Sequence, residues 1–369
     1  MAVSKKAKAI YTNFFDGIET FAANTISNIQ EKQYLHKYCD KKAKLTGEQI
    51  KQIQEFWAPY CKVSPQWALY YSAKNGQFDP RYIPNTLYYT KIDQHFNVRK
   101  LGYGFNDKNY YTKIFDGIKQ PKVLVRKING LILDEKYNLL KIEEAKKIIL
   151  QHNEVICKPS QESGSGRGIQ FFSSETINEI DEFLKNKEYD NYVVQSLLKQ
   201  HPDLNRIHKD SVNCIRICSI LFEEGVYILS SVLRMGFGNS KVDNATSKDN
   251  SAYDGMSCGI DEGGRLKKYA YGYNKGNRMI QHPGGGVTFE GYTIPSYDKA
   301  IELVKECHPR ISNFRLVSWD IAIDEEGEPV LIEANMRKGG INFHQFNNGP
   351  LFGEMTERVL DEVLKKSEN

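Results

Sequence analysis

The spacing of hydrophobic residues predicts that the first 75 residues of this 369-residue chain are helical. In the segment LTGEQIKQIQEFW, Ile50, Ile53 and Phe56 recur at the spacing of one helix face. Thr46 precedes this run and Gln49 stands three residues later, which is the pattern of a capping box. A connector rich in proline and aromatic residues follows. We therefore expect a helical N-terminal region and connector over residues 1–105.

From residue 106 onward, short strand-like and helix-like runs alternate. Two runs have helical periodicity, at residues 141–151 and 176–187. Four runs are typical of strands, at residues 121–134 (two strands and a turn), 154–159, 169–172 and 191–198. This pattern predicts a compact α+β subdomain over residues 106–198.

The remaining residues, 199–369, are rich in predicted strands. Strand-like runs lie at 211–222, 226–237, 315–324 and 329–335, and helical runs lie at 296–308 and 353–366. Residues 236–290 are rich in Gly, Asn and Ser and predict loops. The fold class is therefore α+β, with two α+β subdomains and a helical N-terminal region.

The hairpin at residues 315–335 brings acidic and amide side chains together. If residues 325–328 form the turn, Asp324 pairs with Pro329, and Asp320 lies opposite Glu333. Asn335 stands two residues after Glu333, so it points to the same face. Two carboxylates and an amide oxygen then share one patch.

Such a patch favours a bound cation, because like charges directly opposed in a sheet are destabilising. Hard oxygen ligands suit Mg²⁺, one or two ions of which are typically shared with substrate phosphates. The alternative is a solvent-exposed hairpin face on which the Asp and Glu side chains are hydrated. Four apolar neighbours argue against a fully solvent-exposed face, namely Val317, Ile321, Val330 and Ile332.

A glycine-rich turn follows a predicted strand that ends at Lys158. In QESGSGRG, Gly164, Gly166 and Gly168 allow backbone amides to approach an anion closely, and Arg167 adds charge. The turn is neither a Walker A loop nor a Rossmann fingerprint, since no GKS or GKT follows and the next element is a strand. Taken alone, a flexible hairpin tip explains the glycines equally well.

Two arginines stand on strand-like runs, Arg216 and Arg234. Either is compatible with a surface position, but both could point inward and neutralise phosphate charge. Asn213 has the opposite strand parity to Arg216 and would need a bulge or a strand end to share its site. Cys214 and Cys218 share one strand face, which indicates packing.

Charge and composition narrow the classes of function. The formal charge is +4, from 50 basic and 46 acidic residues, which does not favour nucleic acid as a partner. The lysines near the N-terminus favour solvated helix faces over weak contact with an anionic membrane surface. Seven cysteines without a CxxC pair indicate reduced thiols, and no apolar run approaches the ~20 residues of a membrane span. We expect a cytoplasmic protein, and the sequence carries no signal for its oligomeric state.

Together these motifs resemble the ATP-grasp superfamily. The shared order is a DK-type lysine (Lys108, after Asn106 and Asp107), then CKPSQESGSGRG, then VVQSLL, then Asp320 with an E-x-N motif. The resemblance covers roughly residues 100–350. Within the superfamily the chain is similar to the sugar-transfer-associated group, which is related to glutamate ligases of capsule and teichuronopeptide biosynthesis. The segments that carry this likeness are FDPRYIP, SVNCIRI, LRMGFGNSKVDNAT, HPGGG and SWDIAIDEEGEPVLIEAN.

The resemblance implies a role for each motif. Lys108 and Lys158 would contact the nucleotide phosphates, Arg216 and Arg234 would steady the transferred phosphoryl group, and residues 164–168 would close over the phosphates. The remaining implied contacts are the turn residues Gly164, Ser165, Gly166, Arg167 and Gly168, the adenine hinge Gln195, Ser196, Leu197 and Leu198, the Mg²⁺ ligands Asp320, Glu333 and Asn335, and the acceptor-site residues Asn239, Asp243 and Asn244.

The resemblance implies ATP-dependent ligation of a carboxylate to an amine through an acyl phosphate. A sugar acid or surface-polysaccharide precursor would supply the carboxylate, and an amino acid or amine would be the second substrate. The first alternative is a kinase that phosphorylates a sugar or glycan hydroxyl on the same scaffold. The second is a non-catalytic nucleotide- or glycan-binding module. His208, His282 and His344 are candidate bases, although a structural role is favoured for each.

Overall fold

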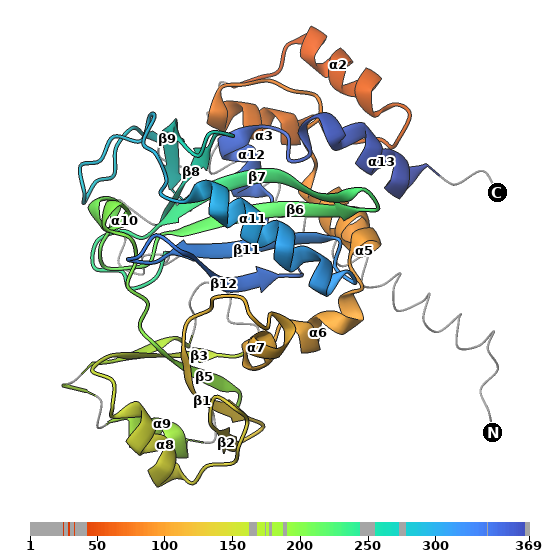
Figure 1. The fold of residues 1–369 in the computed structure, drawn as a ribbon. Helices are drawn as coiled ribbons and strands as arrows, with labels where there is room; N and C mark the ends of the chain where they lie inside the picture. The colour runs from red at the N-terminus through yellow and green to blue at the C-terminus, as the bar shows by residue number, and fades with distance from the viewer. Residues whose placement is uncertain are drawn as a thin grey trace, which may run out of the picture. The chain divides into compact units, whose positions relative to one another are not determined.

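The computed structural model describes residues 25, 29, 33, 43–161, 168–173, 175–176, 179–186, 190–243, 255–272, 278–337 and 339–365. The chain forms two compact units, drawn in Figure 1. One combines Met1–Asn97 with Gly340–Asn369, and the other is Val98–Gly339. The division into residues 1–105, 106–198 and 199–369 stays a prediction.

The first unit is helical in its described residues. Its helices are α2 (Gly47–Trp57), α3 (Gln66–Asn75), α4 (Asn85–Leu87), α5 (Asp93–Phe96), α12 (Asn342–Asn348) and α13 (Thr356–Leu364), with a π-helical turn at Tyr88–Ile92 and a 3₁₀ turn at Gly353–Met355. The capping box of α2 is confirmed, with Gln49 N donating to Thr46 Oγ1 at 3.2 Å and Thr46 N to Gln49 Oε1 at 2.9 Å. Gln345 bonds both backbone groups of Ile83 and so joins the C-terminal segment to the connector.

The second unit contains two antiparallel sheets, visible in Figure 1. The smaller sheet has the order β2-β1-β5-β3-β4. Its strands are β1 (Val123–Ile128), β2 (Leu131–Leu133), β3 (Val155–Pro159), β4 (Gln170–Phe172) and β5 (Tyr192–Ser196), and its helices are α8 (Ile142–Ile149) and α9 (Ile180–Lys185). Ile149 and Phe183 from the helices share a core with Val125 and Val194 from the strands. Burial of these apolar side chains holds the sheet and its helices together.

The larger sheet has seven strands in the order β10-β9-β8-β7-β6-β11-β12. They are β6 (Cys214–Phe222), β7 (Gly225–Met235), β8 (Met256–Ile260), β9 (Leu266–Gly272), β10 (Arg278–Met279), β11 (Leu316–Ile323) and β12 (Pro329–Asn335). The helices of this part are α6 (Gly102–Phe105), α7 (Tyr111–Ile114), α10 (Pro202–Ile207) and α11 (Tyr297–Cys307), with 3₁₀ turns at Arg99–Leu101, Lys108–Tyr110 and His308–Ile311. Helix α11 packs across β11, β12, β6 and β7 (Figure 1).

The prediction of a loop-rich segment at residues 236–290 missed three strands, β8, β9 and β10. Strand β8 pairs with β7 from Ser231 opposite Ile260 to Met235 opposite Met256. These strands are short and contain Gly and Cys, so their local pattern is weak. Pairing with a neighbouring strand decides their structure.

The hairpin of β11 and β12 also differs from the expected register at its turn. Ile323, not Asp324, lies opposite Pro329, and the register shifts between Asp320 and Ile321. The extra residue on β12 restores the predicted pairing of Asp320 with Glu333. No helix in the described part of the chain is long and apolar enough to cross a membrane.

Candidate active site

Asp320 and Glu333 lie opposite each other on β11 and β12, and different cations neutralise them. The Arg216 guanidinium donates to Asp320 through Nε and through Nη2, the latter at 2.7 Å from Oδ2. Arg234 Nη1 lies 3.5 Å from both Asp320 oxygens. Lys108 Nζ donates to Glu333 Oε1 at 2.8 Å. Three basic side chains therefore offset the repulsion between the two carboxylates.

The Asp320 carboxylate is held in its charged form. Burial opposes its ionisation, but the charges of Arg216 and Arg234 outweigh burial and lower its pKa. Glu333 differs, because its side chain keeps 25% of its surface exposed and has one ion pair. The pair thus combines a buried carboxylate with a more accessible one.

The donor atoms on this hairpin fit Mg²⁺. Asn335 Nδ2 donates to Ser318 O at 3.1 Å and lies 3.4 Å from Asp320 Oδ2, so Oδ1 is the amide atom suited to a cation. No group of three or more His, Cys, Asp and Glu side chains in the described residues is arranged to hold a metal by itself. Asp320, Glu333 and Asn335 therefore suit an ion that completes its shell with phosphate and water.

Lys158 and Lys108 approach the hairpin from separate segments. Lys158 lies near the end of β3, and burial together with the charge of Lys108 lowers its pKa to about 8. Lys108 N donates to Ser160 O at 2.9 Å. Gln161 Nε2 donates to Asp107 Oδ2 at 2.9 Å. The DK-type segment is thus bonded to the residues that lead from β3 into the glycine-rich turn.

The glycine-rich turn is described only at its end. Gly164, Ser165, Gly166 and Arg167 lie outside the described residues, as does Asn244 further along the chain. Gly168 has φ +75°, and a Cβ at this position would lie 2.9 Å from Pro159 Cγ. A side chain here would therefore be strained both in backbone conformation and in space.

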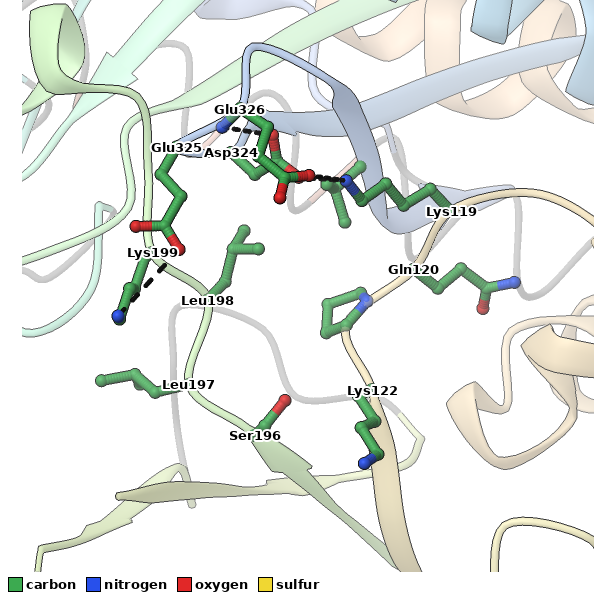
Figure 2. Close-up of a pocket in the computed structure, with 12 residues that line it drawn as sticks. Lys119, Gln120, Lys122, Ser196, Leu197, Leu198, Lys199, Asp324, Glu325 and Glu326 are labelled. Carbon is green, nitrogen blue, oxygen red and sulfur yellow. Dashed lines mark hydrogen bonds and ion pairs between the residues drawn. The ribbon is translucent and has the colours of Figure 1, made fainter. Parts of the chain in front are cut away.

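The predicted adenine hinge lines a pocket of about 280 Å³, shown in Figure 2. Ser196, Leu197 and Leu198 lie on one side, but the side chain of Gln195 is not part of the lining. The rest of the lining comes from the preceding connection and the hairpin turn: Lys119, Gln120, Pro121, Lys122, Lys199, Asp324, Glu325, Glu326 and Val330. Neither Lys108 nor Lys158 lines this pocket.

The segment between α7 and β1 and the connection from β5 to β6 are both bonded to the hairpin that carries Asp320 and Glu333. Leu331 N donates to Lys119 O at 3.0 Å, and Glu325 N donates to Lys199 O at 3.1 Å. Lys119 also forms ion pairs with Asp324 and Glu326 (Figure 2). The hairpin that holds the two carboxylates is therefore bonded to both segments that flank the smaller sheet in the chain.

Two residues near the start of β6, Cys214 and Asn213, differ in their relation to this site. Cys214 lies beside it, although no role there was predicted, and Asn213 points away from it. Cys214 lies two residues before Arg216, and its thiol is near Asp243. Strand parity predicted only packing for Cys214, and the face that it shares with Arg216 was the signal that could have placed it beside the site. Asn213 instead precedes β6, and its Nδ2 donates to Gln200 Oε1 and to the backbone of Leu204. It supports the chain at the start of β6 and does not face Asp320.

Two of the candidate histidines support the segment that follows β7. His208 Nε2 lies 3.0 Å from Gly238 O, and His282 Nε2 lies 3.0 Å from Gly236 O. His282 Nδ1 accepts backbone N–H groups, so Nε2 carries the proton that bonds Gly236. His344 lies in the first unit. These contacts favour structural roles for His208 and His282.

Residues 88–360 match the family described as sugar-transfer associated ATP-grasp. No curated protein matches the chain in sequence. Similar solved structures include D-alanyl-alanine synthetase A from Vibrio cholerae (14% identity, TM-score 0.42, 70% of this chain and 64% of that one). The L-amino acid ligase from Bacillus licheniformis is also similar (14% identity, TM-score 0.38, 72% of this chain and 49% of that one). So is the VanG D-Ala:D-Ser ligase from Enterococcus faecalis (14% identity, TM-score 0.42, 70% of this chain and 60% of that one). This chain thus spans less than two thirds of each of these structures. Because the family match covers most of its length, the chain belongs to the sugar-transfer associated ATP-grasp family and has the ATP-grasp fold.

Proposed function

We propose that this protein is an ATP-dependent carboxylate–amine ligase that forms an amide through an acyl phosphate. The observation that carries the proposal is the group of four basic side chains, from Lys108, Lys158, Arg216 and Arg234, around two carboxylates. A polyphosphate chain needs this density of positive charge. Phosphoryl transfer depends mainly on alignment and charge neutralisation, which such a site supplies.

Lys108 and Lys158 would bind the phosphates of ATP, and the backbone of Ser196 to Leu198 would hold adenine. Asp320, Glu333 and Asn335 would hold one or two Mg²⁺ ions, which would neutralise charge on the phosphate oxygens. Arg216 and Arg234 would then shift part of their contact from Asp320 to the transferred phosphoryl group. Residues 164–168 would cover the site and exclude water.

The reaction would proceed in two displacements. A substrate carboxylate oxygen attacks the γ-phosphorus of ATP, the bond to ADP breaks, and an acyl phosphate forms. The amine nitrogen then attacks the acyl carbon, the carbon–oxygen bond to phosphate breaks, and an amide remains. The family description names only sugar transfer, and on that ground the proposed carboxylate is a sugar acid or a cell-surface polysaccharide precursor, such as one for a capsule. We place the reaction in the cytoplasm, where ATP is available.

The test is a coupled assay of phosphate and ADP release with Mg-ATP. D-glucuronate, D-galacturonate and L-glutamate serve as carboxylates, and L-alanine, glycine and L-lysine as amines, singly and in pairs. Phosphate release that requires both partners supports the ligase. Transfer of phosphate to one hydroxyl acceptor would instead support the kinase, and absence of nucleotide binding would exclude both enzymes.

A further inference from the structure

Asp243 is a carboxylate at the candidate site that the proposed nucleotide and metal contacts do not use. It follows β7, and its Oδ1 lies 3.4 Å from Arg234 Nη2. Its side chain keeps only 13% of its surface exposed. The other oxygen, Oδ2, is buried and has no hydrogen-bond partner among the residues that the structure describes. One oxygen of a buried carboxylate is therefore left to accept a hydrogen bond.

The ion pair with Arg234 accounts for the charge of Asp243 but uses only one of its two oxygens. The guanidinium of Arg234 already faces Asp320, and Arg216 also neutralises Asp320. A buried carboxylate with an unsatisfied oxygen costs free energy of folding. The ion pair through Oδ1 leaves Oδ2 unsatisfied within the described part of the chain, so the position of Oδ2 points to a ligand that donates hydrogen bonds.

The groups around Asp243 come from both sheets. Arg234 on β7, Cys214 and Arg216 on β6, and Asp320 on β11 all influence its carboxylate. Lys158 on β3 in turn experiences the charge of Asp243. Burial, aided by the charge of Asp320 and opposed by that of Arg234, raises the pKa of Asp243. This carboxylate therefore accepts a proton more readily than an exposed one.

We propose that Asp243 binds the ammonium group of the amine substrate through Oδ2 and removes one of its protons before the amine attacks the acyl phosphate. The inference rests on the proposed ligase function. An ammonium group is donor-only and an ionised carboxylate is acceptor-only, so the two are complementary. Proton transfer converts R–NH₃⁺ and the Asp243 carboxylate into R–NH₂ and a carboxylic acid. The nitrogen lone pair then forms the C–N bond as the C–O bond to phosphate breaks. The excess proton on nitrogen leaves with the phosphate.

The experiment compares two nucleophiles in the Asp243→Asn variant. Hydroxylamine is uncharged at neutral pH and traps an acyl phosphate as a hydroxamate without needing a base. The second nucleophile is the amino acid, from L-alanine, glycine and L-lysine, that supports wild-type turnover. We expect hydroxamate formation within about threefold of wild type, whereas amide formation falls by about 100-fold, the size typical of a lost general base.

Glu223→Gln serves as the matched control, because it removes one negative charge from the turn between β6 and β7. We expect it to leave both products unchanged. Equal losses of hydroxamate and amide in Asp243→Asn would assign the residue a structural role and overturn the inference, as would unchanged amide formation. Hydroxamate formation also reports that the variant is folded. If the wild type forms no hydroxamate from any carboxylate, the proposed function itself fails, together with the inference.

Discussion

The two faces of the seven-stranded sheet are built from the same strands, but one packs into the hydrophobic core and the other carries the charged candidate site. On β11, Val317, Trp319 and Ile321 join the hydrophobic core beneath α11. The alternate residues Ser318 and Asp320 lie on the opposite face. Along β6, residues alternate in the same way between the core and the charged site. Strand alternation therefore places the fully buried Trp319 next in sequence to Asp320, which pairs with two arginines.

This difference shows that the residues that stabilise the fold and the residues proposed to bind ATP lie on opposite faces of one sheet. The apolar face contributes through burial and close packing, which tolerate little loss of volume. The charged face holds Arg216, Arg234 and Asp320 out of water, where each depends on the others. Removing Asp320 would take away a carboxylate that two buried cations share, so Glu333 is the better residue with which to test the chemistry alone.

The largest expected effect is on the apolar face. Trp319→Ala should lower the free energy of unfolding by about 3–5 kcal/mol, because it removes a fully buried ring and opens a cavity. It also removes the donor that bonds Ser219 Oγ at 2.8 Å. Urea denaturation followed by circular dichroism measures the change, with Trp319→Phe as the milder control. A loss below about 1 kcal/mol would show that this face is not the main source of stability.

The next effect lies on the charged face. Glu333→Gln should reduce ATP-dependent turnover by about 10²- to 10³-fold, because it removes a charged ligand from the electrostatic site. The unfolding midpoint should change little, since Glu333 is partly exposed. Glu326→Gln, at the exposed turn of the same hairpin, is the control. Wild-type turnover in Glu333→Gln would contradict the assignment of Mg²⁺ to this hairpin.

A smaller effect tests how the charged face is joined to the smaller sheet. Gln161→Leu removes the hydrogen bond to Asp107 beside Lys108. We expect the KM for ATP to rise about tenfold, the effect of losing a bond worth ~1–1.5 kcal/mol, with kcat within about threefold. Steady-state kinetics separate the two constants, and Gln161→Asn should restore part of the affinity. An equal fall in kcat with no change in KM would contradict a positioning role.

The smallest effect is a pH dependence from Lys158. Its pKa of about 8 in the folded protein lies below the ordinary value of 10.5, so the ammonium loses its charge as pH rises through about 8. ATP binding, measured by calorimetry, should weaken by a few-fold over this range, and Lys158→Arg should remove the dependence. Folding stability should change with the opposite sign, rising from about pH 8 toward 10.5, because the unfolded chain binds this proton more tightly. A flat binding profile in the wild type would contradict the assignment of Lys158 to phosphate.

The sequence predicted the elements whose signal is local. The capping box of α2, the hairpin of β11 and β12 and the alternation that opposes Asp320 and Glu333 all follow from neighbouring residues. Strands β8, β9 and β10 could not be predicted in this way, because they are short and depend on pairing with β7. The register shift beside Asp320 was likewise invisible, since a one-residue bulge leaves no distinct local pattern.

By itself the sequence determined the family, the ATP-grasp fold and the pairing of Asp320 with Glu333. Only the tertiary structure decided which cations meet these carboxylates and that Arg234 faces both Asp320 and Asp243. It also decided that the hairpin is bonded to the segments that precede β1 and follow β5. The physical reason is the separation in sequence between the residues that make each contact. Helix caps and strand alternation depend on residues a few positions apart, whereas these contacts join segments separated by many residues and exist only once the two sheets have formed.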